Sequence, residues 1–242
     1  MRLDLYLVSH GVFESRNKAA SAVSEGRIKV NGAVCTKASK EISENDDVST
    51  AASEADEYVG RAALKLEHAL THFGVDVHGM RAVDIGASTG GFTQSLLKHG
   101  AAVVYAVDVG RDQLHEKLKN DVRVISIEGF NARELTLDTV GGAYCDIAVM
   151  DVSFISQTLL YDAVKKVLAP GGIFISLIKP QFELTKSELG KNGVVKSEEC
   201  RRKAVRRVTE CAKESSFRLI GVTESPIEGG SGNTEYLAYF RL

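Results

Sequence analysis

The feature that most constrains the fold of this chain is an apolar run that ends in an acid and is followed by a cluster of glycines. Residues 82–85 (AVDI) form a short β-branched run of the kind found in buried parallel strands. Gly86, Gly90 and Gly91 allow backbone conformations closed to residues with a Cβ, and they let a ligand approach the main chain. A helical pattern begins at Thr93. The stretch therefore predicts a nucleotide-type site at a helix N-terminus and at the carboxyl ends of parallel strands.

The spacing of this loop distinguishes between ligands. Ser88 stands where the dinucleotide fingerprint Gly-x-Gly-x-x-Gly needs its middle glycine, and the carboxylate of Asp84 would repel a pyrophosphate. A cationic ligand without phosphate suits the loop better, and Asp-x-Gly-x-x-x-Gly over residues 84–90 resembles the first motif of S-adenosylmethionine (SAM) dependent methyltransferases. The alternative is a glycine turn in an unrelated α/β domain. The candidate SAM-binding residues in the loop are Asp84, Gly86, Ser88, Gly90, Gly91 and Phe92.

The next two predicted strands also end in polar residues. Residues 102–108 end in Asp108, about twenty residues beyond the glycines, where an acid can accept hydrogen bonds from both ribose hydroxyls of an adenosine. Residues 122–128 form the third strand, and Glu128 and Asn131 follow where an adenine edge would lie. Polar residues after a strand are common in any sheet, so these two have that simpler explanation as well.

Two further strands bring charged residues to the same edge of the sheet. Residues 145–153 carry Asp151, and the apolar residues 172–180 end with Lys179 and a proline. A lysine at the end of an apolar strand is costly to bury and needs a partner or a function. An ion pair between Lys179 and Asp151 that only holds two loops together is the alternative.

The first and last segments of this part of the chain supply two more charged candidates. Residues 62–73 place apolar side chains on one helical face, with Lys65 beside it. Two strands around a glycine-rich loop close the chain, as in an antiparallel hairpin at a sheet edge, and Glu235 stands at the start of the last strand. His68 and His72 are four residues apart, but no third metal ligand has matching spacing, so no metal site is expected.

The N-terminal residues form a separate pattern. Residues 1–10 and 15–23 have the character of short helices, and Ser15 is placed to cap the second. Residues 25–34 alternate as a hairpin with Asn31-Gly32 at its turn. A helix-and-hairpin unit that carries basic side chains suits contact with a phosphate backbone.

Three strings within this pattern carry a resemblance. Residues 2–7 (RLDLYL), 15–19 (SRNKA) and 26–32 (GRIKVNG) resemble the αL RNA-binding module shared by a small-subunit ribosomal protein, tyrosyl-tRNA synthetase and pseudouridine synthases. The resemblance implies contact with structured RNA, whereas a solvated charged face is the simpler alternative. The expected RNA contacts are Arg2, Arg16, Lys18, Arg27 and Lys29.

Composition and segment boundaries complete the expected organisation. We expect an RNA-binding domain over residues 1–50, a small and polar linker over 51–60, and a second domain over 61–242. The net charge of -2 excludes a globally basic protein, so RNA contact must come from local patches. No apolar run approaches the roughly 18 residues of a membrane helix, and no signal-peptide pattern is present, so we expect a cytoplasmic protein without stable membrane association. The four cysteines show no Cys-x-x-Cys pairing and suggest neither zinc nor disulfides.

The charged candidates together carry the most specific resemblance. Lys65, Asp151, Lys179 and Glu235, in this order, resemble the catalytic tetrad of FtsJ-type ribose 2'-O-methyltransferases. The whole chain resembles the TlyA family of rRNA 2'-O-methyltransferases, members of which are often labelled hemolysins. The supporting strings are residues 58–66 (YVGRAALKL), 84–92 (DIGASTGGF), 151–155 (DVSFI), 178–183 (IKPQFE) and 232–237 (GNTEYL). The family tract Ser-Arg-Gly is Gly-Arg-Ala at 60–62 here, which leaves the lysine in register.

The resemblance implies a fold and a reaction. The fold is a Rossmann-like α/β domain with a seven-stranded sheet plus a small α+β RNA-binding domain, and the partners are SAM and ribosomal RNA or a ribosomal subunit. A ribose hydroxyl needs a group that takes its proton, and Lys179 is the candidate base, with Lys65 and Glu235 orienting the reacting groups. A membrane-active hemolysin and a non-catalytic RNA-binding protein with the same fold are the alternatives.

Overall fold

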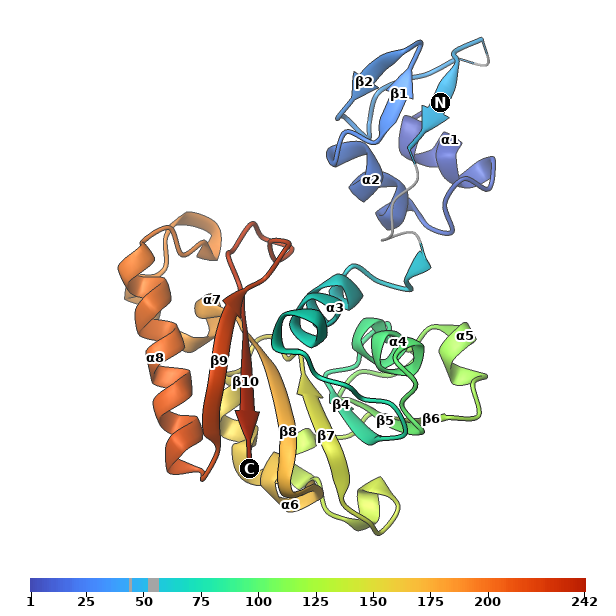
Figure 1. The fold of residues 1–242 in the computed structure, drawn as a ribbon. Helices are drawn as coiled ribbons and strands as arrows, with labels where there is room; N and C mark the ends of the chain where they lie inside the picture. The colour runs from blue at the N-terminus through green and yellow to red at the C-terminus, as the bar shows by residue number, and fades with distance from the viewer. Residues whose placement is uncertain (44, 52–56) are drawn as a thin grey trace. The chain divides into compact units, whose positions relative to one another are not determined.

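The computed structural model describes residues 1–43, 45–51 and 57–242, and the chain divides into two compact units, Met1–Glu57 and Tyr58–Leu242 (Figure 1). The smaller unit packs α1 (Leu3–Ser9) and α2 (Arg16–Ser24) against a three-stranded antiparallel sheet. Its strands are β1 (Ile28–Val30), β2 (Ala33–Cys35) and β3 (Val48–Thr50), in the order β2-β1-β3.

The expected hairpin in the smaller unit is confirmed. Val30 pairs with Ala33, and the two residues between them, Asn31 and Gly32, have φ values of 54° and 78°. Positive φ at both central positions defines the type of two-residue hairpin turn that the sequence Asn-Gly favours. The expected cap is confirmed too, because the Ser15 side chain accepts a hydrogen bond from the backbone N–H of Lys18 at 3.3 Å.

The segment expected as a linker is structured at both of its ends. Strand β3 pairs with β1 through Thr50 opposite Ile28, so the chain remains in the small sheet just before position 51. Residues 52–56 of the expected linker lie outside the described residues. Tyr58 and Val59 are 6% and 9% exposed and belong to the larger unit. Apolar side chains at these two positions explain why the larger unit begins before residue 61.

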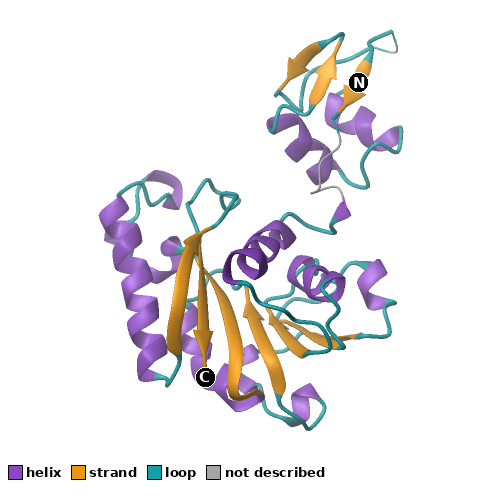
Figure 2. Ribbon diagram, viewed as in Figure 1, coloured by secondary structure: helices purple, strands orange, loops and turns teal. Residues whose placement is uncertain are grey.

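The larger unit is built on the expected seven-stranded sheet, with strand order β6-β5-β4-β7-β8-β10-β9 (Figure 2). Strands β4 to β8 are parallel, and β10 runs antiparallel to both β8 and β9. The terminal hairpin therefore lies at one edge, as expected. The strands are β4 (Arg81–Ile85), β5 (Val103–Asp108), β6 (Val124–Glu128), β7 (Cys145–Met150), β8 (Leu168–Ile178), β9 (Arg218–Glu224) and β10 (Tyr236–Arg241).

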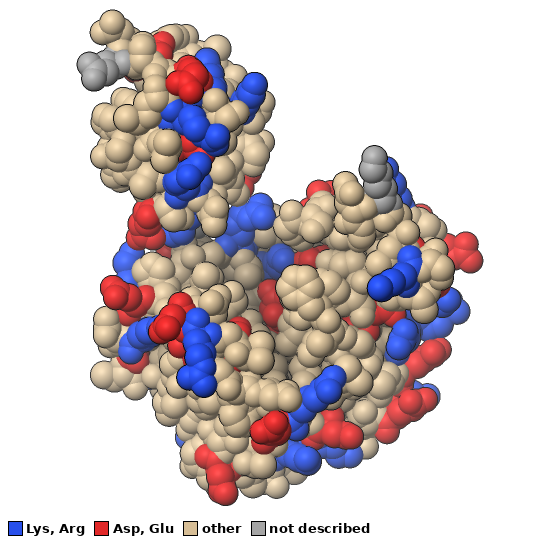
Figure 3. All heavy atoms as spheres, turned by 180° about the vertical axis from the view of Figure 1, so that it is seen from behind, with Lys and Arg blue, Asp and Glu red and all other residues tan. Residues whose placement is uncertain are grey.

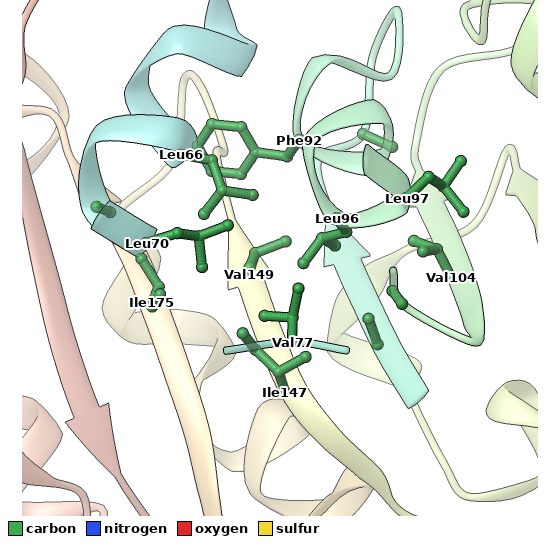
Figure 4. Packing of buried hydrophobic residues seen from close by; sticks show 14 of the residues in the cluster. Leu66, Leu70, Val77, Phe92, Leu96, Leu97, Val104, Ile147, Val149 and Ile175 are labelled. Atoms are coloured by element: carbon green, nitrogen blue, oxygen red, sulfur yellow. The ribbon is translucent and has the colours of Figure 1, made fainter. Parts of the chain in front are cut away.

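Helices cover both faces of this sheet and bury two apolar clusters. The first cluster joins the α3 and α4 side chains to one face, and Figure 4 shows Phe92 beside Leu66 within it. The second joins α6 and α8 to the other face. Full burial of a leucine such as Leu66 contributes about 1.5–3 kcal/mol. The helices are α3 (Ala62–Phe73), α4 (Gly91–Lys98), α5 (Glu116–Lys119), α6 (Tyr161–Val167), α7 (Pro180–Glu183) and α8 (Glu198–Glu214). Short 3-10 helices are Ala132–Glu134, Asp138–Val140, Gln157–Leu160 and Lys186–Glu188.

Candidate active site

The glycine loop between β4 and α4 is held by close backbone contacts. Gly86 has φ of 84°, and a Cβ there would lie 2.5 Å from the carbonyl oxygen of Asp151. A Cβ at Gly91 would lie 2.9 Å from the backbone nitrogen of Ala63 at the start of α3. Both glycines are therefore needed sterically. They bring the loop against the segment that carries Asp151 and against the helix that carries Lys65.

Asp84 is completely buried beneath this loop. One of its carboxylate oxygens accepts a hydrogen bond from the hydroxyl of Thr93 at 2.7 Å. The other oxygen has no hydrogen-bond partner within the described part of the chain. Burial is the main cause that raises the pKa of Asp84 to about 7; the hydrogen bond from Thr93 opposes the rise, and the nearby carboxylates of Asp151 and Asp108 contribute to it. A site with these acids favours a cationic ligand.

Asp108 ends β5, at the same edge of the sheet. Its carboxylate accepts hydrogen bonds from the backbone N–H groups of Ser88 and Gly110, each at 2.7 Å. Ser88 is exposed and has φ of 49°. The acid thus shapes the glycine loop and the loop after β5 together, and each of its oxygens keeps a further lone pair for a ligand hydroxyl.

The other expected cofactor residues have other contacts. The Glu128 carboxylate accepts backbone hydrogen bonds from Gln113 at 2.7 Å and from Leu114 at 2.9 Å, and the bond from Leu114 is the main cause that lowers its pKa. The Asn131 side chain caps a 3-10 helix by accepting from the N–H of Arg133. The Phe92 side chain is 2% exposed and lies in the apolar cluster of Figure 4, so it packs into the core and does not face the loop.

The four tetrad candidates form two ion pairs. Lys65 Nζ lies 2.5 Å from Glu235 Oε2, and both side chains are buried. Lys179 Nζ lies 2.5 Å from Asp151 Oδ1, with side-chain exposures of 11% and 14%.

Strand register places these pairs at the end of the sheet where the parallel strands have their carboxyl ends. Tyr236 pairs with Ile178, so Glu235 and Lys179 occupy the next position on neighbouring strands. Met150 pairs with Ser176 on the other side of β8, and Asp151 follows Met150 directly. The carboxyl ends of β7 and β8 and the start of the antiparallel β10 thus gather residues that are far apart in the sequence.

Sequence reasoning missed two polar residues near the tetrad. The Ser153 hydroxyl oxygen accepts a hydrogen bond from Lys179 Nζ at 2.8 Å. Asn233 is 1% exposed, accepts from the N–H of Val195 and donates to the carbonyl of Gly193. Only their positions two residues from Asp151 and Glu235 could have indicated them.

Phe154 is also unexpected, because a large apolar side chain there is 88% exposed and has φ of 66°. Its ring lies 5.3 Å from that of Phe182, between centroids. Phe154 is three residues after Asp151, and Phe182 is three after Lys179. An aromatic pair, of which Phe154 is exposed and Phe182 half-buried, therefore follows the two residues of one tetrad ion pair.

The basic residues of the smaller unit are organised partly by an acid. The Asp4 carboxylate, which is 3% exposed, accepts hydrogen bonds from Arg2 and from Arg16, and the bond from Arg2 is the main cause that holds its pKa well below the usual value. Lys18 pairs with Glu14, and the half-buried Arg27 pairs with Glu25. Lys29 is exposed on β1. Figure 3 shows Lys and Arg side chains gathered over a face of this unit.

The described residues contain neither a metal cluster nor a membrane-spanning helix. Across these residues, no three His, Cys, Asp or Glu side chains are grouped so that they could hold a metal ion. None of the helices in the described ranges is long and apolar enough to cross a membrane.

The sheet order, the glycine loop and the acid at the end of β5 define a SAM-dependent methyltransferase fold. The FtsJ-like methyltransferase family matches residues 58–242, and the S4 domain matches residues 1–48. Hemolysin A of Brachyspira hyodysenteriae is 42% identical over 240 residues, which cover 99% of each chain. The 16S/23S rRNA (cytidine-2'-O)-methyltransferase TlyA of Mycobacterium tuberculosis is 39% identical over 240 residues, 99% of this chain and 89% of that protein.

Solved structures agree with these relatives. A structure from Streptococcus thermophilus that carries a hemolysin label matches with a TM-score of 0.80 and 39% identity, over 100% of this chain and 88% of that one. The chain therefore belongs to the TlyA family, in which an N-terminal S4 domain precedes an FtsJ-like methyltransferase domain.

Proposed function

We propose that this protein transfers a methyl group from SAM to the 2'-hydroxyl of a ribose in ribosomal RNA. One observation carries the proposal. Two lysine–carboxylate pairs, Lys65–Glu235 and Lys179–Asp151, lie at the carboxyl ends of the parallel strands, beside the glycine loop. Relatives named as rRNA (cytidine-2'-O)-methyltransferases support cytidine as the target nucleoside. The substrate is free ribosomal RNA or a ribosomal subunit.

The residues of the glycine loop fit SAM. One buried Asp84 oxygen has no hydrogen-bond partner among the described residues, and together with Asp108 and Asp151 it makes a site with excess negative charge. In this arrangement Asp108 would hold the ribose hydroxyls of the adenosine, and Asp84 would offset positive charge beneath the loop. Bound SAM supplies a methyl group on a cationic sulfur, and the carbon–sulfur bond breaks as the new carbon–oxygen bond forms.

Lys179 accepts the proton of the ribose hydroxyl at Nζ. A neutral amine has one lone pair for this proton, and the ammonium that results is stabilised by the Asp151 carboxylate at 2.5 Å. Lys65 donates toward the hydroxyl oxygen, and Glu235 fixes the direction of Lys65 through their buried contact. The side chains from four separate elements thus hold one hydroxyl in a reactive orientation.

The test compares Lys179→Ala with Lys186→Ala, a matched removal of an exposed lysine on the following 3-10 helix. We expect single-turnover methyl transfer to rRNA to fall by about two to four orders of magnitude in Lys179→Ala, the usual contribution of a general base, and to stay near wild type in the control. Melting temperature and SAM affinity should change little in both variants.

A purely structural pair gives a different result. Loss of one partner would then leave a carboxylate unpaired and lower the free energy of unfolding by up to about 3–5 kcal/mol. Near-normal transfer to a ribose hydroxyl by Lys179→Ala would contradict the proposed base.

A further inference from the structure

Ser153 is the second group that binds the candidate base. Lys179 Nζ donates a hydrogen bond to Ser153 Oγ at 2.8 Å, in addition to its contact with Asp151. The serine is exposed, so this bond does not satisfy a buried hydroxyl. This hydrogen bond contributes little to the stability of the fold, because the exposed hydroxyl could bond to water equally well.

The segment that carries Ser153 is fixed on both sides. Before it, the backbone N–H of Asp151 donates to the carbonyl of Ile85 at 3.0 Å. After it, the buried Glu183 accepts from the hydroxyl of Ser156 at 2.5 Å and from the backbone N–H of Gln157 at 3.0 Å. Glu183 follows Lys179 by four residues, so the same short stretch carries the lysine and anchors the serine segment. The position of Ser153 relative to Lys179 is therefore well defined.

The contact with Ser153 affects function because the bonds and the lone pair of a lysine nitrogen point in a few fixed directions. A neutral amine has two N–H bonds and one lone pair, arranged approximately as a tetrahedron with the side-chain carbon. Ser153 accepts one N–H bond, and Asp151 Oδ1 lies beside the nitrogen as its ion-pair partner, so the lone pair has fewer directions left than with Asp151 alone. With Asp151 alone, the amine can still rotate and direct its lone pair elsewhere.

We propose that Ser153 is a positioning residue that orients the Lys179 lone pair toward the ribose hydroxyl. The inference rests on the proposed function, in which Lys179 takes the hydroxyl proton. The proton passes from the hydroxyl to Nζ, and the oxygen keeps the electron pair with which it bonds the methyl carbon. Ser153 neither gains nor loses a proton in this step; it accepts the same N–H bond throughout.

The experiment compares three variants of the full-length chain with wild type. Ser153→Ala removes the acceptor, Ser153→Thr keeps it, and Ser187→Ala removes an exposed serine that contacts Thr185 instead. We expect Ser153→Ala to lower the single-turnover rate about tenfold, the effect of one missing hydrogen bond, with KM for rRNA and affinity for SAM unchanged. Ser153→Thr should restore the rate to within about twofold, and Ser187→Ala should match wild type.

The outcomes separate this inference from the proposed function. A Ser153→Ala rate equal to wild type, while Lys179→Ala is inactive, overturns the positioning role alone. A lowered rate that Ser153→Thr does not restore, or that comes with a lower melting temperature, also overturns it, because then the loop and not the hydroxyl is affected. Absence of ribose methylation by the wild-type protein overturns both.

Discussion

The carboxyl group of Asp84 is fully buried, and burial raises its pKa to about 7, well above the ordinary value of 3.8. A raised folded-state pKa means that the folded protein holds a proton that the unfolded chain has already released. Its contribution to stability is therefore present below pH 4 and is lost as the pH rises through about 7. The folded protein is therefore less stable when Asp84 is ionised, and such a loss of stability is expected in a site that binds a cationic ligand.

Asp84→Asn should therefore change stability in a pH-dependent way. At pH 8 the substitution should increase the free energy of unfolding by about 2–4 kcal/mol, because it removes a buried charge, and the gain should shrink as the pH falls and nearly vanish below pH 4. SAM affinity should move in the opposite direction. Wild-type affinity should rise about tenfold from pH 6 to pH 8 as the carboxyl ionises, and Asp84→Asn should bind weakly with a flatter pH dependence.

Calorimetry in buffers of different ionisation enthalpy measures both parts of the SAM prediction. Wild type should release protons on binding SAM near neutral pH, and Asp84→Asn should release fewer. Equal proton release and equal affinity in the two proteins would contradict a role for Asp84 in holding the cation.

At the scale of single elements, the sequence predicts the main parts of the fold because each central strand is an apolar run with a polar residue at or next to its carboxyl end. Strand β3 is different. Its three residues, Val48–Thr50, follow an acidic and polar stretch, and they become a strand only through pairing with β1. Local composition carries little information about such a pairing.

The candidate site was predictable to a similar degree. Asp151 and Lys179 follow recognisable strands, Glu235 directly precedes one, and Lys65 lies within a helix, and the structure brings the four together as two ion pairs. Phe92 differs because the second position of α4 faces α3, so a side chain next to the loop packs into the core. Apart from their spacing of two residues from Asp151 and Glu235, nothing in the sequence indicates Ser153 and Asn233, since their partners, Lys179 and the 193–195 segment, lie 26 or more residues away.

The loop between β9 and β10 packs against the Glu235 carboxylate and supports its position. A Cβ at Gly229 would overlap the carboxylate of Glu235, whereas a Cβ at the next residue, Gly230, meets nothing within 4 Å. Gly229→Ala should displace Glu235 and with it Lys65, and lower single-turnover methyl transfer by about one to two orders of magnitude. Gly230→Ala is the matched control and should keep wild-type activity.

SAM affinity distinguishes a local effect from general damage. Gly229→Ala should bind SAM as wild type does, because the contacts of Asp84 and Asp108 lie elsewhere. If both glycine variants transfer methyl groups equally well, displacement of Glu235 does not affect the reaction. The proposed role of the Lys65–Glu235 pair in orienting the ribose hydroxyl is then wrong.

At the scale of the whole molecule, the two units carry separate chemistry. The larger unit contains the acidic loop site and the lysine–carboxylate pairs, and the smaller unit has its own apolar core and a basic surface. The net charge of -2 gives no general attraction for RNA. RNA affinity must therefore come from local groups, of which Arg16 and Lys29 are well placed because the first is oriented by Asp4 and the second is exposed on β1.

Removal of these two charges tests the division of labour. In Arg16→Gln/Lys29→Gln, RNA affinity should fall at low salt, and the slope of log affinity against log salt should become shallower by about 0.7–0.9 for each phosphate that the protein no longer neutralises. SAM affinity should not change, because the substitutions lie in the other unit. Removal of a single exposed charge from the larger unit, Lys166→Gln on α6, serves as the control and should leave the slope as in wild type. A double variant with the wild-type slope would show that these side chains do not bind phosphates, since counterion release scales with the number of neutralised phosphates whatever the RNA sequence.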